Sequence, residues 1–132
     1  YTFAMPDGRE GEMLKATLDA TDIVIASPLY WYSVSAAAKL YLDYWADWLR
    51  VPGIDFKATM GKKTLWGVCA ASDPDRAVAE PLVGTLRLSA RFLGMGWGGV
   101  LFGDGSKPGD VMKDAKALAE AKTFFARTPE KA

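Results

Sequence analysis

Residues 22–35 read Asp-Ile-Val-Ile-Ala-Ser-Pro-Leu-Tyr-Trp-Tyr-Ser-Val-Ser, and this stretch decides the fold. The β-branched run at 23–25, closed by Pro28, is typical of a short strand that is buried on both faces, as in a parallel sheet. A loop over 28–35 follows, and Ser33 or Ser35 is a candidate N-cap for the next helix. A buried strand that leads through a loop into a helix is the first half of a βαβ unit.

The rest of the chain continues this alternation. We expect helices at 12–20, 36–50, 74–93 and 110–126, strands at 21–27, 62–69 and 97–102, and irregular chain at 6–11, 54–61 and 103–109. Asp73 and Pro74 fit the N-cap and first turn of the third helix. In the last helix, Asp110 is the expected cap, and Met112, Ala115, Leu118 and Phe125 are expected to face inward. Right-handed crossovers then give a parallel sheet with helices on both faces.

Composition narrows the class of protein. The 132 residues are 50% hydrophobic, with 16 basic and 16 acidic side chains, one Cys and no His. One domain over 1–132 is expected at this length. Because the charges balance, the composition has no excess of basic side chains that would predict binding to nucleic acid or to an anionic membrane surface. Without His, imidazole-dependent triads are excluded, and one Cys leaves no intrachain disulfide or thiolate zinc site. A lone cysteine fits the cytoplasm best, and no apolar run reaches the ~20 residues that span a bilayer.

The three predicted strands end at 27–33, 69–73 and 102–105. In an open parallel sheet, ligands bind beyond these carboxyl ends. Three consecutive aromatic residues, Tyr30, Trp31 and Tyr32, stand at the first end. Their loop offers backbone N–H and C=O groups and ring faces to a planar heterocycle. Alternatively, the rings cover the end of the sheet or make a subunit contact.

Other unusual features have structural interpretations. The glycines at 94–99 follow a helix and enter a strand, whereas a dinucleotide fingerprint follows a strand and opens a helix. They therefore indicate a helix stop and close packing. Cys69, at a strand end, is expected to be a small packed residue. The aromatic residues of the second helix fit either the core or a subunit contact: Tyr41, Tyr44, Trp45 and Trp48.

Residues 22–43 resemble the third strand, flavin loop and following helix of the NAD(P)H-dependent FMN reductase family, which has the flavodoxin-like fold. The matching positions are Ser27, Pro28, Tyr30, Trp31, Ser33, Ser35, Lys39 and Asp43. The resemblance extends by topology over nearly the whole chain. It implies a three-layer α/β fold with a parallel sheet. The family's first two strands and its phosphate-binding loop have no counterpart here, so we expect this chain to be about the C-terminal two-thirds of one domain. We also expect the strand at 22–27 to have an open edge.

The resemblance also implies a chemistry. FMN would be bound non-covalently, NAD(P)H would be the electron donor, and a quinone, flavin or similar small molecule would be the acceptor. The implied flavin contacts are Pro28, Leu29, Tyr30, Trp31, Tyr32 and Ser33, with Ala70, Ala71 and Ser72 as weaker ones. No catalytic side chain and no metal are implied, and a homodimer or homotetramer is expected.

Two alternatives belong to other classes. One is a flavodoxin-type electron carrier that does not turn over nicotinamide. The balanced charge argues against it, since a strongly acidic surface steers such carriers to basic partners. The other is a flavin-free interaction module on the same scaffold, with residues 30–32 as its partner surface.

Overall fold

The computed structural model describes residues 2–132. Three parallel strands, β1 (Asp22–Pro28), β2 (Thr64–Ala71) and β3 (Gly96–Asp104), form a sheet in that order, and the two-residue β4 (Glu130–Lys131) pairs antiparallel with β3. The helices are α1 (Gly8–Asp19), α2 (Ala36–Trp48), α3 (Phe56–Met60), α4 (Glu80–Phe92) and α5 (Ala115–Phe124), with 3₁₀ turns η1 (Arg76–Ala79) and η2 (Asp110–Lys113).

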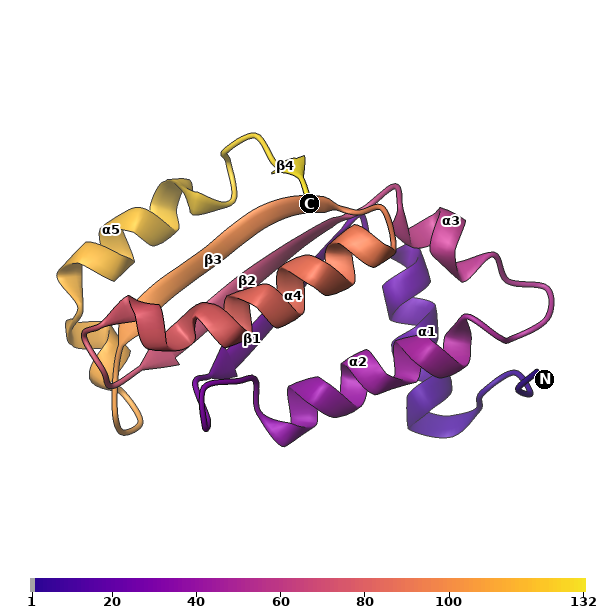
Figure 1. Ribbon diagram of the computed structural model, residues 1–132, viewed down its shortest axis with the longest axis horizontal. Coiled ribbons are helices and arrows are strands. Elements are labelled where there is room, and N and C mark those ends of the chain that lie inside the picture. The colour runs from indigo at the N-terminus through magenta and orange to yellow at the C-terminus, as the bar shows by residue number, and fades with distance from the viewer. Residues whose placement is uncertain (1) are drawn as a thin grey trace.

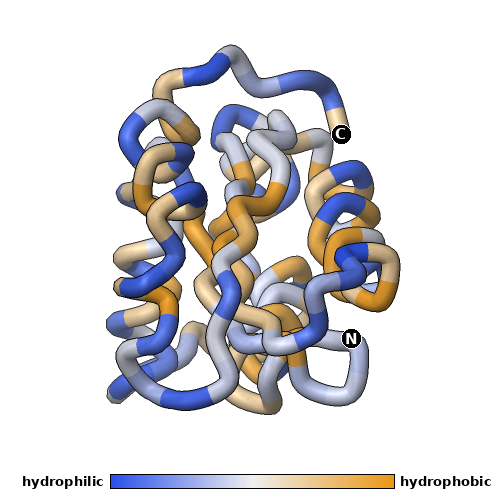
Figure 2. Tube along the Cα trace, turned by 90° about the vertical axis from the view of Figure 1, so that its left-hand side faces the viewer, coloured by the Kyte–Doolittle hydropathy of each residue, from blue (hydrophilic) through white to orange (hydrophobic). Residues whose placement is uncertain are grey.

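The helices flank the sheet on both faces, which confirms the expected three-layer arrangement. Helices α2 and α4 lie on one face and α5 on the other (Figure 1). The hydrophobic stretches of the strands run through the middle of the molecule, between helices in which hydrophilic and hydrophobic residues alternate (Figure 2). No helix within residues 2–132 is long and apolar enough to cross a membrane.

The glycine-rich run before and within β3 has the predicted packing role. Gly94 has φ +71°, the left-handed conformation that commonly ends a helix. A Cβ on Gly98 would fall 2.0 Å from a ring atom of Trp66 on the neighbouring strand. The ladder is bulged between Leu65 and Trp66. These glycines therefore end α4 and let the indole of Trp66 lie flat against the backbone of β3.

The segment at 54–61 contains a short helix that the sequence pattern did not predict. The Asp55 carboxylate accepts a hydrogen bond from the Ala58 N–H at 3.1 Å, which caps α3. Phe56 and Met60, one turn apart, are both buried in the main core. Burial of these two side chains stabilises a helix of five residues that would be too short to form alone.

Helix α1 begins at Gly8 rather than at residue 12, so residues 8–11 of the loop predicted over 6–11 are helical. Glu10 lies in its first turn, where a carboxylate is favoured by the helix dipole. Its Oε1 also accepts a hydrogen bond of 3.0 Å from the buried Trp48 indole N–H. This contact with α2 is tertiary and leaves no local sequence signal.

Helix α4, in contrast, begins later than predicted, at Glu80 rather than at residue 74. Pro81 has no N–H, and its ring would clash with the carbonyl four residues earlier, so an α-helix from residue 74 cannot run through it. The chain instead makes the turn η1, where the Asp75 carboxylate accepts from the Ala77 N–H at 3.0 Å. The α-helix then starts with Pro81 in its first turn, where proline is tolerated.

Helix α5 is capped by Asp114 and not by Asp110, as the 3.0 Å hydrogen bond from the Ala117 N–H shows. Phe124 is the buried residue of α5, and Met112 lies in the preceding turn η2 rather than in the helix. The predicted inward face was therefore wrong, because its members are exposed: Met112, Ala115, Leu118 and Phe125.

Strand β1 is buried on one face only, which corrects the expectation of burial on both. Ile23 and Ile25 point into the main core, whereas Val24 is 49% exposed. The reason is that α5 packs against β3 and leaves the same face of β1 uncovered. Within residues 2–132, β1 pairs only with β2. Its other edge is open, as expected.

Candidate functional site at the carboxyl edge of the sheet

A tight turn follows β1. The N–H of Tyr30 donates to the carbonyl of Ser33, and the N–H of Ser33 donates to the carbonyl of Tyr30, both at 3.0 Å. The two central residues, Trp31 and Tyr32, have φ values of +47° and +67°. This reciprocal pairing with two positive φ angles is the pattern of a type I′ turn, which normally takes Asn or Gly at its centre.

Two bulky aromatic residues in left-handed conformation strain this turn. The conformation costs an L-residue roughly 1–2 kcal/mol. Packing does not repay that cost, because the Trp31 side chain is 93% exposed and those of Tyr30 and Tyr32 are more than half exposed. Local strain of this kind is concentrated at functional sites. The turn is therefore the strongest structural sign of function in the described chain.

The turn also presents free hydrogen-bond donors. Among residues 2–132, the backbone N–H groups of Trp31 and Tyr32 have no acceptor. Successive N–H groups and exposed ring faces at the end of a parallel strand suit a planar heterocycle with carbonyl and ring-nitrogen acceptors.

Ser27 holds the base of the turn in place. Its buried hydroxyl donates to the carbonyl of Pro28 and accepts from the N–H of Ser35, both at 2.8 Å. The Ser35 hydroxyl in turn caps α2 through the Ala38 N–H. The N–H of Leu29 donates to the carbonyl of Ala70 at 2.9 Å, which ties the turn to β2. Ser27 matches the family pattern, but its positioning role was not predicted.

A hollow of about 360 Å³ lies beside the turn. It brings together five of the predicted site residues from the ends of β1 and β2: Pro28, Leu29, Tyr30, Ala70 and Ser72. Trp31, Tyr32 and Ser33 form the rest of the turn and are not part of this lining. Ala71 is buried, because the alternation of β2 turns it away from this hollow.

The third wall of the hollow is the loop at 105–109, which sequence reasoning placed at a strand end but not in the site. The Asp110 carboxylate accepts from the N–H groups of Ser106 and Lys107, both at 3.2 Å. The Gly105 N–H donates to the Ala71 carbonyl at 3.1 Å. The run Gly-Ser-Lys-Pro-Gly between a strand and a helix was the available signal, since such turn residues often border a ligand.

An ion pair joins the loop after β2 to the end of β3. The Arg76 guanidinium lies 2.5 Å from the Asp104 carboxylate and over the Phe102 ring, with 5.3 Å to its centroid. It also donates to the Asp73 carbonyl at 3.1 Å. Asp73 does not cap α4 as predicted, because the α-helix begins only at Glu80. The Asp73 carboxylate instead accepts from the Asp75 N–H, and that of Asp75 accepts from the Ala77 N–H, so both cap local turns. This cluster fixes the loop in place and does not form an acid–base pair.

Cys69 is buried near the end of β2, as expected for a small packed residue. Burial raises the pKa of its thiol, and the nearby Arg76 charge only partly offsets this shift. The thiol is therefore protonated at neutral pH and is a poor nucleophile.

A second hollow, of about 410 Å³ and mostly apolar, continues from the carboxyl edge along the sheet face that α5 leaves partly uncovered. Ser27, Pro28 and Ala70 border it on the strands, and Leu118 borders it on α5. The two hollows share Pro28 and Ala70, so one extended ligand can reach both.

Comparison with known proteins identifies the fold family. The family model described as flavodoxin-like fold matches residues 2–126. The chain belongs to this family. It is 30% identical over 117 residues to the Bacillus subtilis protein YwqN, whose name is that of an NAD(P)H-dependent FMN-containing oxidoreductase. That alignment covers 88% of this chain but 65% of YwqN, so the chain spans slightly less than two-thirds of this relative.

Solved structures agree with the family assignment. The Trp repressor binding protein from Bacillus subtilis superposes with a TM-score of 0.83 at 29% identity, over 90% of this chain and 77% of that one. An NADPH-quinone reductase from P. pentosaceus superposes with a TM-score of 0.66 at 19% identity, over 89% and 74%. The second likeness is one of fold alone. The flavodoxin-like fold of the described residues is thus confirmed.

The carboxyl edge fits the ring system of FMN. The turn provides two free backbone donors and exposed aromatic faces, and the hollow beside it is lined mainly by small or apolar groups. Within residues 2–132, no glycine-rich loop joins a strand to a helix N-terminus in the way that cradles a phosphate. The described residues therefore fit the ring end of the cofactor better than its phosphate end.

Proposed function

We propose that this chain forms the ring-binding part of an FMN-dependent oxidoreductase, which takes electrons from NAD(P)H and passes them to a quinone, flavin or similar small acceptor. The observation that carries the proposal is the strained turn at Tyr30–Ser33, with its two free N–H groups beside a hollow. The name of the relative YwqN supports the choice of FMN and NAD(P)H.

The proposed roles follow from where the residues lie. The N–H groups of Trp31 and Tyr32 would donate to acceptor atoms of the flavin ring, and Ala70 and Ser72 would line the hollow that receives it. Pro28, Leu29 and Tyr30 exclude water from the ring. Ser33 closes the turn, and the buried Ala71 holds the loop at 105–109 in place, because its carbonyl accepts from the Gly105 N–H. We infer that all of these residues belong to one domain.

FMN, when bound, supplies the redox chemistry, because its ring accepts hydride from a nicotinamide and passes electrons on. The side chains of this chain bind and orient. Two observations support this division of labour: the sequence has no His, and burial raises the pKa of the single thiol. No described side chain is therefore assigned a proton-transfer role.

The proposal is tested on the full gene product. FMN is titrated into the purified protein and followed by flavin fluorescence, and NADH or NADPH is then added without oxygen while the flavin absorbance is recorded. We expect saturable quenching and then bleaching without any partner reductase. Binding of FMN without bleaching by NADH or NADPH would contradict the proposed enzyme activity and favour an electron carrier. No binding of FMN would contradict the proposed flavin site and favour an interaction module.

A further inference from the structure

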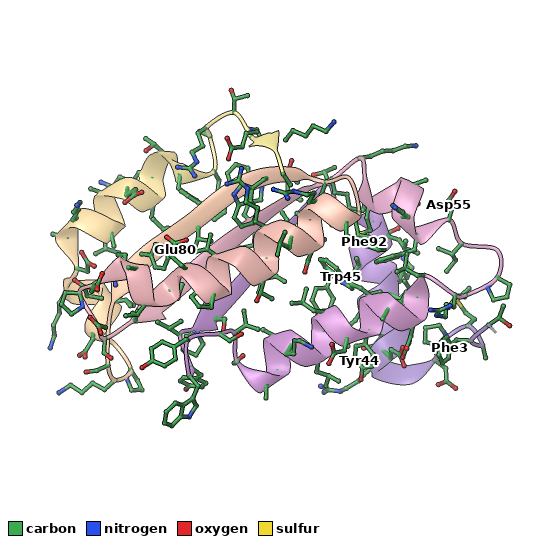
Figure 3. All side chains as sticks on the ribbon, in the orientation of Figure 1. Phe3, Tyr44, Trp45, Asp55, Glu80 and Phe92 are labelled. Carbon is green, nitrogen blue, oxygen red and sulfur yellow. The ribbon has the colours of Figure 1, made fainter. Side chains whose placement is uncertain are left out.

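The loop at 105–109 places a lysine at the rim of the hollow beside the turn. Lys107 lines this hollow together with Tyr30 of the turn and Ser72 after β2. Among the described residues that line it, Lys107 carries the one charge at neutral pH. The loop and the turn lie at the same end of the sheet (Figure 1), and side chains extend outward from both (Figure 3). A ligand in the hollow therefore meets a single cation.

The backbone on both sides of the Lys107 side chain is fixed. Its N–H donates to the Asp110 carboxylate, and its carbonyl accepts from the Asp110 N–H, both at 3.2 Å. Pro108 and Gly109 stand at the centre of this turn, and Gly109 has φ +88°, which position i+2 of a type II turn requires. This rigid base lowers the entropy that is lost when the ammonium group binds a ligand.

The ammonium group of Lys107 is available to a ligand. The side chain is exposed, and its Nζ takes part in no ion pair or hydrogen bond within residues 2–132. Arg76, the cation after β2, is instead paired with the Asp104 carboxylate at 2.5 Å. A lysine ammonium group binds phosphate as a point charge. Lys107 is therefore suited to an anionic group that enters at the rim of the hollow.

The other side of the loop has the opposite charge. A hollow of about 500 Å³ lies there, and it shares Ser72, Gly105 and Ser106 with the hollow beside the turn. Arg76 neutralises one of its acidic residues, and an excess of negative charge remains. An anionic group is therefore repelled from this side of the loop and attracted to the lysine side. The charged residues that line the acidic hollow are Asp104, Asp110, Lys113 and Asp114.

We propose that the Lys107 ammonium group binds the diphosphate of the dinucleotide that reduces the flavin, an assignment that rests on the proposed function. For hydride transfer, the nicotinamide ring must lie against the flavin ring, and one ribose joins it to the diphosphate. The diphosphate therefore falls near the rim of the hollow, where Lys107 lies. NADH and NADPH share this diphosphate, whereas only NADPH carries a 2′-phosphate. Lys107 thus strengthens the binding of both donors.

The test uses dinucleotides that cannot transfer hydride, so that affinity is measured without turnover. The tetrahydronicotinamide forms of NADH and NADPH are titrated by calorimetry into the FMN-loaded full gene product. Lys107→Gln should weaken the binding of both analogues about fivefold, the upper range for an exposed ion pair. Lys107→Arg should keep most of the affinity. In about 1 M salt, where the Debye length is about 3 Å, Lys107→Gln and the wild type should bind nearly equally.

Lys113→Gln is the matched control. Lys113 is also an exposed lysine between β3 and α5, but it lines the acidic hollow. This variant should bind both analogues like the wild type. The FMN dissociation constant and the thermal midpoint of Lys107→Gln should also equal those of the wild type, because the lost ammonium group makes no ion pair or hydrogen bond within residues 2–132.

The FMN titration separates this assignment from the proposed function. A wild type that does not bind FMN would contradict the proposed function and the donor site with it. If the wild type binds FMN and Lys107→Gln binds both analogues equally well, the assignment of Lys107 alone is contradicted. Weaker binding of the NADPH analogue alone would replace the diphosphate by the 2′-phosphate. Weaker binding of FMN, with unchanged binding of the analogues, would contradict the donor contact in favour of a flavin contact.

Discussion

Two groups of aromatic residues differ in almost every physical respect although they are neighbours in sequence. On α2, Trp45 and Trp48 are buried, and the Trp48 ring meets that of Phe56 edge to face with 5.7 Å between centroids. In the turn that precedes α2, Trp31 and Tyr32 are exposed and have positive φ angles. The first group stabilises the fold, whereas the second lowers its stability.

The comparison teaches where to look for function in this chain. Buried aromatic residues contribute through burial and edge-to-face packing, and their presence needs no ligand. Exposed aromatic residues in a strained turn make no such contribution to the isolated protein. Their conformation is understandable if a ligand compensates for it, which is the basis of the flavin proposal.

The largest expected effect is in the buried group. Trp48→Ala should lower the free energy of unfolding by about 3–5 kcal/mol, because it removes a fully buried ring and leaves the Glu10 carboxylate without its indole partner. Urea denaturation measures the change. Trp31→Ala is the matched substitution in the exposed group and should change stability by less than about 1 kcal/mol. Equal losses of unfolding free energy in the two variants would contradict the proposed difference between the buried and the exposed aromatic residues.

The next effect lies at the base of the turn. Ser27→Ala should cost about 1–3 kcal/mol, because the Ser35 N–H then loses its acceptor in a partly buried position. Urea denaturation again gives the value. Ser33→Ala removes a hydroxyl that makes no hydrogen bond within residues 2–132 and should be nearly neutral. A neutral Ser27→Ala would show that the turn is held by other contacts.

A smaller effect of opposite sign is expected within the turn. Replacing Tyr32 by Gly relieves a left-handed conformation, which is worth roughly 1–2 kcal/mol. The added backbone entropy of Gly in the unfolded state offsets roughly 0.5–1 kcal/mol of that gain. The thermal midpoint should therefore rise slightly. A clear fall would mean that Tyr32 makes stabilising contacts and that the turn is not strained.

The smallest effect concerns pH at Asp114, the N-cap of α5. Hydrogen bonds from the N–H groups of Ala117 and Asp104 lower the pKa of the Asp114 carboxyl below its ordinary value of 3.8. The resulting stability is present above that value and is lost as the pH falls through the lower, folded-state pKa. Asp114→Asn should show a flatter decline of the thermal midpoint in this acid range. Parallel curves for the two proteins would contradict the assignment.

The strand-to-helix unit at 22–48 could be predicted because its signals are local. A β-branched run specifies β1, and Ser35 specifies the start of α2. The short helix α3 could not be predicted, because its stability comes from the burial of Phe56 and Met60 against distant residues. The misplaced start of α4 was predictable in principle, since Pro81 forbids the longer helix.

The candidate site, like the fold, could be predicted from the sequence only in part. Its position at the carboxyl edge follows from the alternation of strands and helices, and the family resemblance pointed to the turn. The strained backbone had no signal, because Tyr-Trp-Tyr-Ser contains none of the residues that normally take positive φ angles. The loop at 105–109 was missed because its contacts to Asp110 and Ala71 form only in the folded protein.

The most direct test of the account is the FMN dissociation constant of the full gene product with Trp31→Ala. Ala keeps the same demand for a positive φ, so the substitution isolates the ring. By analogy with aromatic stacking on nucleobases, the account predicts that binding weakens by roughly 1–3 kcal/mol. Phe125→Ala, at a partly exposed aromatic residue that packs on Trp66 and lines neither hollow, should leave binding unchanged. An unchanged dissociation constant for Trp31→Ala would remove this residue from the site and contradict the central claim.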